Sequence, residues 1–350
     1  MKKGILAAGA CAVASIFALV EYSAAVEACS RILWNTNSQA VVTARTMDLY
    51  MDDKPRLVYL PRGIARRGAD VDGAARWTSK YASIAVTGMD AASDDGLNEA
   101  GLGVHLLYLH GSEHEPADPR PAVSNLIWAQ YALDNFATVA EALEGLKQVR
   151  VVSRVAAGRE WPLHLALEDA SGDSAIVEYV GGKMLVHHGK EFTVMTNEPA
   201  MDEQLANLKR YKLFGGDLAM PGDIDPMSRF VRASSYLKTL PAPADDREAA
   251  GYLAGLIRNV AVPFGAPDTS GSVSADAWPT RWATLTDHSH RRYFFLPVHG
   301  PNVFWVDMAK FDPASSTILA VDPYAVDLSG EISSQLKSYA PIQSEYPPAF

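Results

Sequence analysis

Short apolar stretches, alternating with polar positions or unbroken, dominate the first half of the chain. They are rich in Val, Ile, Leu and Tyr and are bounded by turn residues, which is typical of β-strands. The predicted strands are Ala40–Thr46, Arg56–Leu60, Ala82–Thr87, Gly103–Leu109, Leu163–Leu167, Ala175–Val180, Met184–His188 and Phe192–Thr196. Ser171–Asp173 and Gly181–Gly182 have hairpin-turn chemistry. Links this short require antiparallel neighbours.

Helical periodicity or capping residues mark four other segments. A Thr followed three positions later by Glu forms a capping box, and Asp before Pro is a typical helix start. The predicted helices are Val123–Asn135, a helix from Thr138 to about Val149, one that begins at Asp225–Pro226, and Glu248–Val260. Two late strands are expected at Arg292–Pro297 and Val303–Met308. Runs of strands and of helices, without strict alternation, predict an α+β fold with antiparallel sheets covered by helices.

The first 28 residues have the pattern of a secretory signal peptide. Two lysines precede an apolar stretch, Gly4–Val20, and the segment ends with the small residues Val26 and Ala28 at the positions that signal peptidase reads. Cleavage after Ala28 would make Cys29 the first residue of the mature chain. We therefore predict a periplasmic or secreted protein in which residues 29–350 form a single domain.

Composition narrows the function classes. The chain has 350 residues, 48% of them hydrophobic, and a net charge of −10 with scattered basic residues, so a nucleic-acid partner is not expected. After the leader no apolar run is long enough to span a bilayer, so the processed chain is not expected to bind a membrane. The nine histidines show no tight zinc spacing, with His288 and His290 expected in a polar loop, and neither metal nor cofactor is expected.

The two cysteines differ in their expected fates. Cys11 lies in the apolar part of the leader and would leave with it, so the mature chain would hold Cys29 alone and no internal disulfide. A free α-amine on Cys29, with a pKa of about 8, can act as a base toward the thiol of the same residue. Two alternatives stay open: Cys29 is an ordinary buried cysteine, or Cys11 is lipidated and the chain is a lipoprotein.

A cation and a carboxylate follow Cys29 on the next predicted strand. The link Asn35–Ser38 is polar and turn-like, so an antiparallel hairpin would return Arg45 and Asp48 to the chain start. A nearby Arg favours thiolate over thiol, and the Asp would hold the α-amine. The alternative is a surface ion pair.

Five motifs occur in order between Cys29 and Phe230. They are Cys29 followed by Ala44–Asp48, then Trp77–Tyr81, Asp95–Leu102, Met195–Pro199, and Pro221–Asp223 followed by Pro226–Phe230. In this order they resemble the choloylglycine hydrolase family, which includes bile salt hydrolases and penicillin V acylases. The resemblance implies a four-layer αββα N-terminal nucleophile hydrolase fold over residues 29–350, a small-molecule amide substrate and a homo-oligomer, since the family is often tetrameric.

The resemblance also implies a role for each matching residue. Cys29 is the nucleophile, Arg45 the cation beside the thiol, and Asp48 the acceptor that holds the α-amine. Asn197 is similar to the oxyanion-hole side chain, and Arg229 to the late arginine of the site. The alternatives are a plain turn before Pro for Asn197 and an exposed helix charge for Arg229.

Tyr108 falls where bile salt hydrolases have Asn and penicillin V acylases can have Tyr, and its backbone N–H would serve the oxyanion hole. With the leader, it favours the Gram-negative branch, which includes penicillin V acylases and acylases of N-acyl homoserine lactones. We therefore expect an exported amidase for penicillin V or N-acyl homoserine lactones. The alternatives are a hydrolase of conjugated bile salts or N-acyl amino acids, and an exported binding protein on a decayed version of the fold.

Two further expectations concern packing. Four aromatic residues are candidates for an acyl pocket, although such residues belong more often to the core: Trp34, Tyr50, Tyr59 and Trp128. Gly103 is expected to allow a close backbone approach within the strand that it begins.

Overall fold

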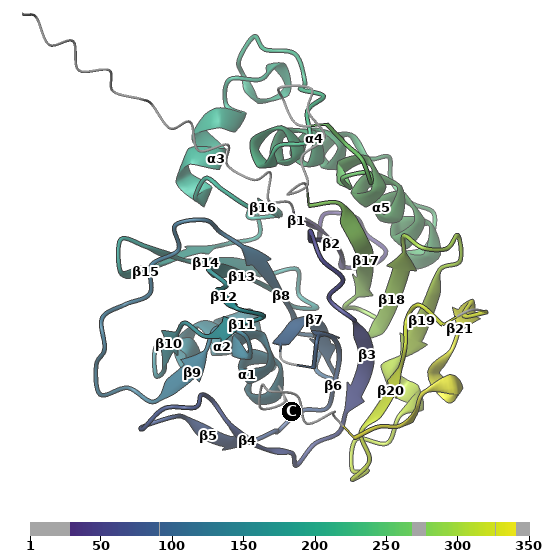
Figure 1. The fold of residues 1–350 in the computed structure, drawn as a ribbon. Helices are drawn as coiled ribbons and strands as arrows, with labels where there is room; N and C mark the ends of the chain where they lie inside the picture. The colour runs from purple at the N-terminus through teal and green to yellow at the C-terminus, as the bar shows by residue number, and fades with distance from the viewer. Residues whose placement is uncertain (1–28, 91, 268–277, 326, 341–350) are drawn as a thin grey trace, which may run out of the picture.

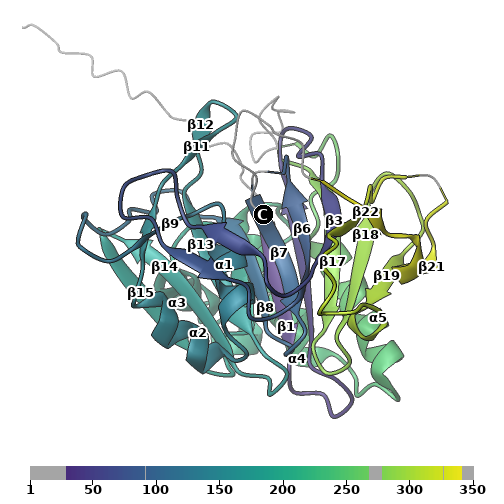
Figure 2. The same ribbon diagram turned by 90° about the horizontal axis from the view of Figure 1, so that it is seen from below.

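The computed structural model describes residues 29–90, 92–267, 278–325 and 327–340, so the predicted signal peptide lies outside the described residues. Two large β-sheets pack against each other, and helices cover their outer faces (Figures 1 and 2). Apolar side chains of both sheets meet in one buried cluster, which includes Ile32 and Ala44 of the first sheet and Ile84 and Leu107 of the second. The four-layer αββα fold is thus confirmed.

The first sheet has seven strands, which are antiparallel except for the last pair. In spatial order they are β16 (Val194–Thr196), β1 (Cys29–Trp34), β2 (Val42–Asp48), β17 (Thr280–Asp287), β18 (Arg292–Pro297), β19 (Phe304–Asp307) and β21 (Gly330–Glu331). β1 and β2 form the predicted hairpin, in a register that pairs Cys29 with Met47. The sequence analysis missed β17, which lies between β2 and β18.

The second sheet has nine antiparallel strands. In spatial order they are β15 (Lys183–His188), β14 (Ser174–Val180), β13 (Leu163–Glu168), β8 (Gly103–Tyr108), β7 (Ala92–Asn98), β6 (Ser83–Gly88), β3 (Arg56–Leu60), β20 (Leu319–Val321) and β22 (Lys337–Ser338). Three small pairs lie outside it: β4 (Ala65–Arg67) with β5 (Arg76–Thr78), β9 (Ala122–Ser124) with β10 (Arg150–Val152), and β11 (Val155–Ala156) with β12 (Arg159–Glu160). The strands predicted for this sheet are confirmed to within one or two residues.

Two groups of helices cover the sheets. α1 (Trp128–Asn135) and α2 (Val139–Leu146) share a buried cluster with the second sheet, and α4 (Pro226–Thr239) and α5 (Asp246–Val260) contact the first. α3 (Met201–Leu208) was not predicted; the short 3₁₀ helices are η1 (Lys212–Phe214), η2 (Met308–Lys310) and η3 (Ser333–Gln335). None of the helices in the described ranges has the length and apolar character needed to cross a membrane.

Helix caps follow the sequence closely, with one boundary error. Thr138 Oγ1 accepts from Glu141 N at 3.2 Å, so the predicted N-cap is confirmed. The Glu141 carboxylate accepts from Ala137 N at 2.9 Å, one residue before the position that a capping box requires. Asp225 caps α4, with Pro226 at its first turn. The helix predicted from Val123 is wrong before Trp128, because Ala122–Ser124 pair with β10 instead.

His288 corrects the expectation of a polar loop. Its side chain is fully buried, with Nε2 2.9 Å from Thr43 Oγ1 and Nδ1 3.1 Å from the carbonyl oxygen of Gly101. A Cβ on Gly103 would lie 2.4 Å from the His288 ring and 2.8 Å from a carboxylate oxygen of Glu168. The close approach at Gly103 is therefore made by two side chains and not by backbone as expected, and a larger residue would collide with them.

Candidate active site

Cys29 is the first residue of β1, where β1, β2, β16 and the start of α4 come together. Its side chain is buried, and Sγ lies 3.8 Å from the carbonyl oxygen of Asp48. β16 pairs with β1 through Thr196 and Ser30, so Asn197, one residue beyond β16, falls beside Cys29. The backbone nitrogen of Cys29 donates to Asn197 Oδ1 at 2.5 Å. The fold thus brings Asn197 to Cys29 across 168 positions of the sequence.

Asn197 holds three groups with one amide side chain. Its Oδ1 accepts from Cys29 N and, at 3.0 Å, from Arg229 Nη2, while its Nδ2 donates to the carbonyl oxygen of Tyr108 at 2.7 Å. An amide NH₂ carries two hydrogens, so one N–H is engaged by Tyr108 and the other is the donor predicted for an oxyanion. Asn197 is more than a turn residue before Pro199.

The ladder with β13 fixes the direction of the backbone at Tyr108. Leu109 N donates to Pro162 O at 3.0 Å, and Tyr108 is paired with Leu163 in the ladder between β8 and β13. Because N–H directions alternate along an antiparallel strand, the N–H of Tyr108 points away from β13. The oxyanion role itself stays a prediction.

Arg229 is fully buried, so the alternative of an exposed helix charge is wrong. From the first turn of α4 its Nη1 reaches the carbonyl oxygen of Cys29 and the hydroxyl of Ser30, both at 2.6 Å. Its Nε donates to Ile224 O at 2.9 Å. Through these contacts and the bond to Asn197, Arg229 fixes the backbone of Cys29 and the side-chain amide of Asn197 in place.

Arg45 and Asp48 are also fully buried, so they are not a surface ion pair. Arg45 Nη2 donates to Leu106 O at 2.8 Å, and its guanidinium lies 4.7 Å from the centre of the Trp282 ring. Asp48 Oδ2 accepts from Thr46 Oγ1 at 3.2 Å. Asp48 Oδ1 has no hydrogen-bond partner among the described residues. That oxygen is the acceptor left for the predicted α-amine.

Burial has the largest effect on the pKa values of Cys29 and Asp48. It raises the pKa of the Cys29 thiol to about 11, although the charge of Arg45 opposes this rise. It also raises the pKa of Asp48 to about 7, against the charge of Arg229 and hydrogen bonds from Thr280 and Thr46. With Cys29 nitrogen in a peptide bond the thiol is therefore protonated at neutral pH, and a base is needed to make it nucleophilic.

An apolar pocket opens at Cys29, Arg45 and Asp48. Its other lining residues include Leu106, Tyr108, Leu126, Trp161, Leu163 and Trp278. The Tyr108 ring packs edge-on against Trp278, with ring centres 5.3 Å apart. The guanidinium of Arg159 lies 4.8 Å from the Trp161 ring centre and donates to the Tyr108 hydroxyl at 3.2 Å.

Of the aromatic residues that line this pocket, Tyr108 was predicted from the sequence, and Trp161 and Trp278 were not. Tyr59 and Trp128 are buried in the core, and Trp34 stacks on Tyr252. Tyr50 alone of the four candidates lies near the pocket, with its ring centre 5.6 Å from that of Trp278. Trp161 and Trp278 each stand directly before a proline at the start of a strand, and this Trp-Pro pattern is the signal that could have found them.

Within the described residues, one group of acidic and imidazole side chains has metal-like spacing. Ligand atoms of Asp246, Asp287 and His290 lie within 4.8 Å of one another, at the start of α5 and the turn after β17. Arg292 already donates to Asp246 at 2.9 Å. The group is not part of the pocket at Cys29.

Comparisons with known proteins identify the family of the chain. The family described as linear amide C–N hydrolases, choloylglycine hydrolase family, matches residues 29–318, so the match begins at Cys29. A penicillin V acylase from Pectobacterium atrosepticum is 36% identical over 362 residues, which cover 94% of this chain and 95% of that protein. A bile salt hydrolase/transferase from Clostridium perfringens is 28% identical over 59% of this chain and 70% of that protein.

Solved structures extend the comparison. The penicillin V acylase from Agrobacterium tumefaciens has a TM-score of 0.80 at 39% identity, covering 89% of this chain and 98% of that one. A mutant of the conjugated bile acid hydrolase from Clostridium perfringens has a TM-score of 0.69 at 20% identity over 86% of this chain and 98% of its own, a likeness of fold alone. The chain belongs to the choloylglycine hydrolase family of linear amide hydrolases, the family its five motifs resemble.

Proposed function

We propose that this protein is an exported amidase that cleaves linear amides with Cys29 as an N-terminal nucleophile, and that penicillin V and N-acyl homoserine lactones are its substrates. The observation that carries the proposal is the position of Cys29, which is hydrogen-bonded to Asn197 and, through its carbonyl oxygen, to Arg229. Cys29 also lines an apolar pocket together with Arg45, Trp161 and Trp278. The similarity to penicillin V acylases over nearly the whole chain supports the same substrate class.

The first half of the proposed reaction forms a thioester. The α-amine of mature Cys29 takes the thiol proton, and Sγ attacks the amide carbonyl carbon. The carbonyl π electrons move to oxygen, where the second N–H of Asn197 and the backbone N–H of Tyr108 receive the negative charge. The C–N bond then breaks as the protonated α-amine gives its proton to the leaving amine.

The second half releases the acid. The α-amine, now neutral again, removes a proton from water as the water attacks the thioester carbonyl. The C–S bond breaks, and Cys29 leaves as a thiol after protonation. Asp48 Oδ1 would hold the α-amine in place through both halves, since it is the carboxylate oxygen without a partner beside Cys29.

In this proposal, nearby charges stabilise the nucleophile and the packing of the pocket sets the acyl-group preference. Arg45 favours the thiolate against the effect of burial, and Arg229 fixes the amide of Asn197. The pocket walls, with Trp161, Trp278 and the Tyr108 ring, suit flat phenoxyacetyl groups or linear acyl chains better than a rigid steroid. One methylene in an apolar pocket changes specificity by only about 1–3 kcal/mol, so the acyl range should be broad.

Specificity constants on one preparation test the substrate part. We expect penicillin V and decanoyl homoserine lactone to exceed glycocholate, with Cys29→Ser as the inactive control. A tenfold preference for glycocholate, about 1.4 kcal/mol of transition-state stabilisation, would instead support a bile salt hydrolase. A protein inactive on all three would support the binding-protein alternative.

Export, maturation and assembly are parts of the same proposal. The leader pattern supports cleavage after Ala28 and a periplasmic or secreted location. Intact mass and N-terminal sequence of the exported protein test the cleavage, and light scattering tests the homo-oligomer. A mature chain that begins elsewhere would remove the α-amine from the proposed mechanism.

A further inference from the structure

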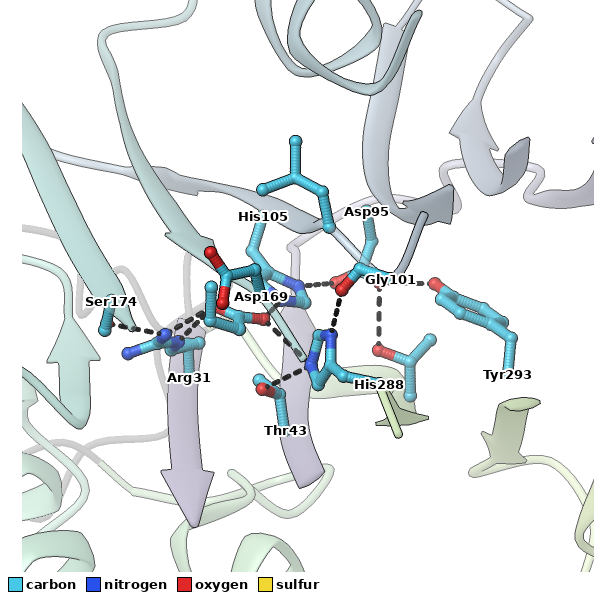
Figure 3. A network of polar contacts seen from close by, with 12 residues as sticks. Arg31, Thr43, Asp95, Gly101, His105, Asp169, Ser174, His288 and Tyr293 are labelled. Carbon is cyan, nitrogen blue, oxygen red and sulfur yellow. Dashed lines mark hydrogen bonds and ion pairs between the residues drawn. The ribbon is translucent and has the colours of Figure 1, made fainter. Parts of the chain in front are cut away.

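A chain of buried charged side chains crosses the interface between the two sheets (Figure 3). It ends beside Arg45 of the candidate active site. Arg31 of β1 donates to Glu168 of β13, with Nε 3.1 Å from Oε2. Glu168 contacts Nε2 of His105 on β8, and His105 Nδ1 lies 2.6 Å from Asp95 Oδ2 on β7. The same oxygen of Asp95 lies 3.8 Å from Nε of Arg45. All five side chains are at most 1% exposed.

His105 is held as an imidazolium by this arrangement. Each of its ring nitrogens faces a carboxylate oxygen, and an ionised carboxylate only accepts hydrogen bonds, so both nitrogens carry a proton. Burial alone would lower the pKa of His105, but Asp95 and Glu168 raise it to about 9. Burial likewise acts to raise the pKa of Glu168, and the charges of Arg31 and His105 reverse this and hold that pKa well below its usual range.

The carboxylate of Asp95 is occupied by donors other than Arg45. Its Oδ1 accepts from the hydroxyl of Tyr293 and from Thr284 Oγ1 at 3.3 Å, and its Oδ2 accepts from His105. The approach of Arg45 at 3.8 Å is too long for a hydrogen bond. Nε and Nη1 of Arg45 have no hydrogen-bond partner among the described residues. Among the described residues, the guanidinium that lines the pocket with Cys29 thus has no hydrogen-bonded anion as a partner. The carboxyl of Asp94 on β7, which lines the same pocket, also acts on its charge.

We propose that His105 is a positioning residue of the active site: its imidazolium holds the Asp95 carboxylate and so keeps the charge of Arg45 available to the Cys29 thiolate. Without that imidazolium, Arg45 is the cation left beside Asp95, and a close pair between the two would draw the guanidinium away from Cys29. The inference deepens the proposed function, because it rests on Cys29 and Arg45 acting in the reaction.

The environment of His105 defines which groups act on its charge. Charged and titratable side chains come from both sheets around it: Asp95 on β7 and Glu168 on β13 in direct contact, and Arg31 on β1, Arg45 on β2, His288 after β17 and Tyr293 on β18 next to those carboxylates. Removing a buried charge between two carboxylates leaves both uncompensated. Matched substitutions are therefore needed to separate positioning from folding.

The test is the pH dependence of Cys29 alkylation by iodoacetamide in the mature protein. His105→Asn keeps a donor toward Asp95 but loses the charge, and we expect the apparent pKa of the thiol to rise by about one unit, which slows alkylation about tenfold at pH 7. Asp95→Asn removes the anion that competes for Arg45, so we expect faster alkylation at pH 7. Damage to folding alone would not shift the two variants in opposite directions.

Two further variants complete the experiment. His288→Asn is the matched control. The polar partners of His288 among the described residues are Glu168 at 3.4 Å, Thr43 and Gly101, and not Asp95, so the thiol profile should stay that of the wild type. Tyr293→Phe removes one donor from Asp95 without a change in charge, and it should shift the profile as His105→Asn does, but less. It also keeps the inference testable if His105→Asn does not fold.

The outcomes separate this inference from the proposed function. Alkylation needs no substrate, so a protein inactive on every amide would still show the opposite shifts. A wild-type thiol profile in both His105→Asn and Tyr293→Phe, or a shift of His105→Asn and Asp95→Asn in the same direction, would overturn the positioning role while leaving the amidase proposal intact.

Discussion

Replacing Asn197 by Asp and by Ala separates two functions of one side chain. The Oδ1 atom accepts from Cys29 N and Arg229, and the Nδ2 atom donates to Tyr108 O. Asn197→Asp preserves both acceptor contacts and removes the donor. Asn197→Ala removes all three hydrogen bonds. Comparing the two variants therefore tells the donor function from the structural one.

The expected magnitudes follow from these contacts. A buried hydrogen bond contributes about 1 kcal/mol net, so Asn197→Ala should lose about 3 kcal/mol of unfolding free energy. Asn197→Asp should lose less, because a carboxylate still accepts from Cys29 N and gains attraction to the Arg229 guanidinium. The two variants should not differ in this way in turnover, because both lack the N–H proposed to stabilise the oxyanion. Loss of one such donor lowers kcat by roughly 100–1000-fold.

The assay combines turnover with stability. Release of 6-aminopenicillanate from penicillin V gives kcat, and denaturant unfolding gives the free energy of unfolding for the same preparations. Asn98→Ala is the matched control, because Asn98 is a buried amide that donates to Leu133 O and Phe136 O and accepts from Leu102 N, with no contact to Cys29. It should lose stability like Asn197→Ala but keep the turnover of the folded enzyme.

The reasoning fails in two distinguishable ways. If Asn197→Asp keeps kcat within tenfold of the wild type, the side chain is not an oxyanion donor and the charge is received elsewhere. If Asn197→Ala has the same free energy of unfolding as the wild type, the three contacts around Cys29 do not contribute to stability as their geometry implies.

Three further predictions address maturation, packing and pH. Blocking the leader with Ala28→Trp should give a folded but inactive protein, since the base would stay tied up in a peptide bond; activity measured on a chain of unprocessed mass would refute this. Gly103→Ala should cost about 1–3 kcal/mol of stability through contact with His288 and Glu168, whereas Gly255→Ala, in open space on α5, should add about 0.5–1 kcal/mol. Burial acts to raise the pKa of Glu178, but hydrogen bonds from His164 and His187 lower it to about 2; the resulting stability is present above the ordinary carboxyl pKa and is lost as pH falls toward 2. Denaturant unfolding should therefore show Glu178→Gln less stable than the wild type at pH 7, with the difference shrinking by pH 3, and a pH-independent difference would contradict this origin.

The parts of the fold that the sequence predicted are those with local signals. Hairpin turns such as Gly181–Gly182 and the cap at Thr138 act over a few residues, and the structure follows them. β17 was missed although it lies in the middle of the first sheet between β2 and β18, because the Trp278–Pro279 pair before it was not recognised as the start of a strand. The start of α1 was placed too early because parallel pairing of Ala122–Ser124 with β10 is a long-range contact.

The candidate site was predicted more fully than its surroundings. The motif residues around Cys29 come together in the structure, since the hairpin and β16 bring them to one end of the first sheet. The pocket tryptophans and the buried chain through His105 were not predicted. Those residues lie on strands and loops whose contacts depend on how two sheets face each other, which no spacing along the chain encodes.

Burial explains why this site would need both an arginine and a base within Cys29 itself. Desolvation raises the pKa of the thiol to about 11 even with Arg45 nearby, so the arginine alone does not produce a thiolate at neutral pH. A peptide nitrogen at Cys29 cannot take the proton, whereas an α-amine on the same residue can. Arg45 would then stabilise the Cys29 thiolate that this proton transfer creates. Its effect depends on Asp95 being bonded to His105 and not to Arg45. Cleavage would thus supply the α-amine that accepts the proton. The buried charged residues from Arg31 to Arg45 would supply the positive charge that stabilises the thiolate, and neither would be sufficient without the other.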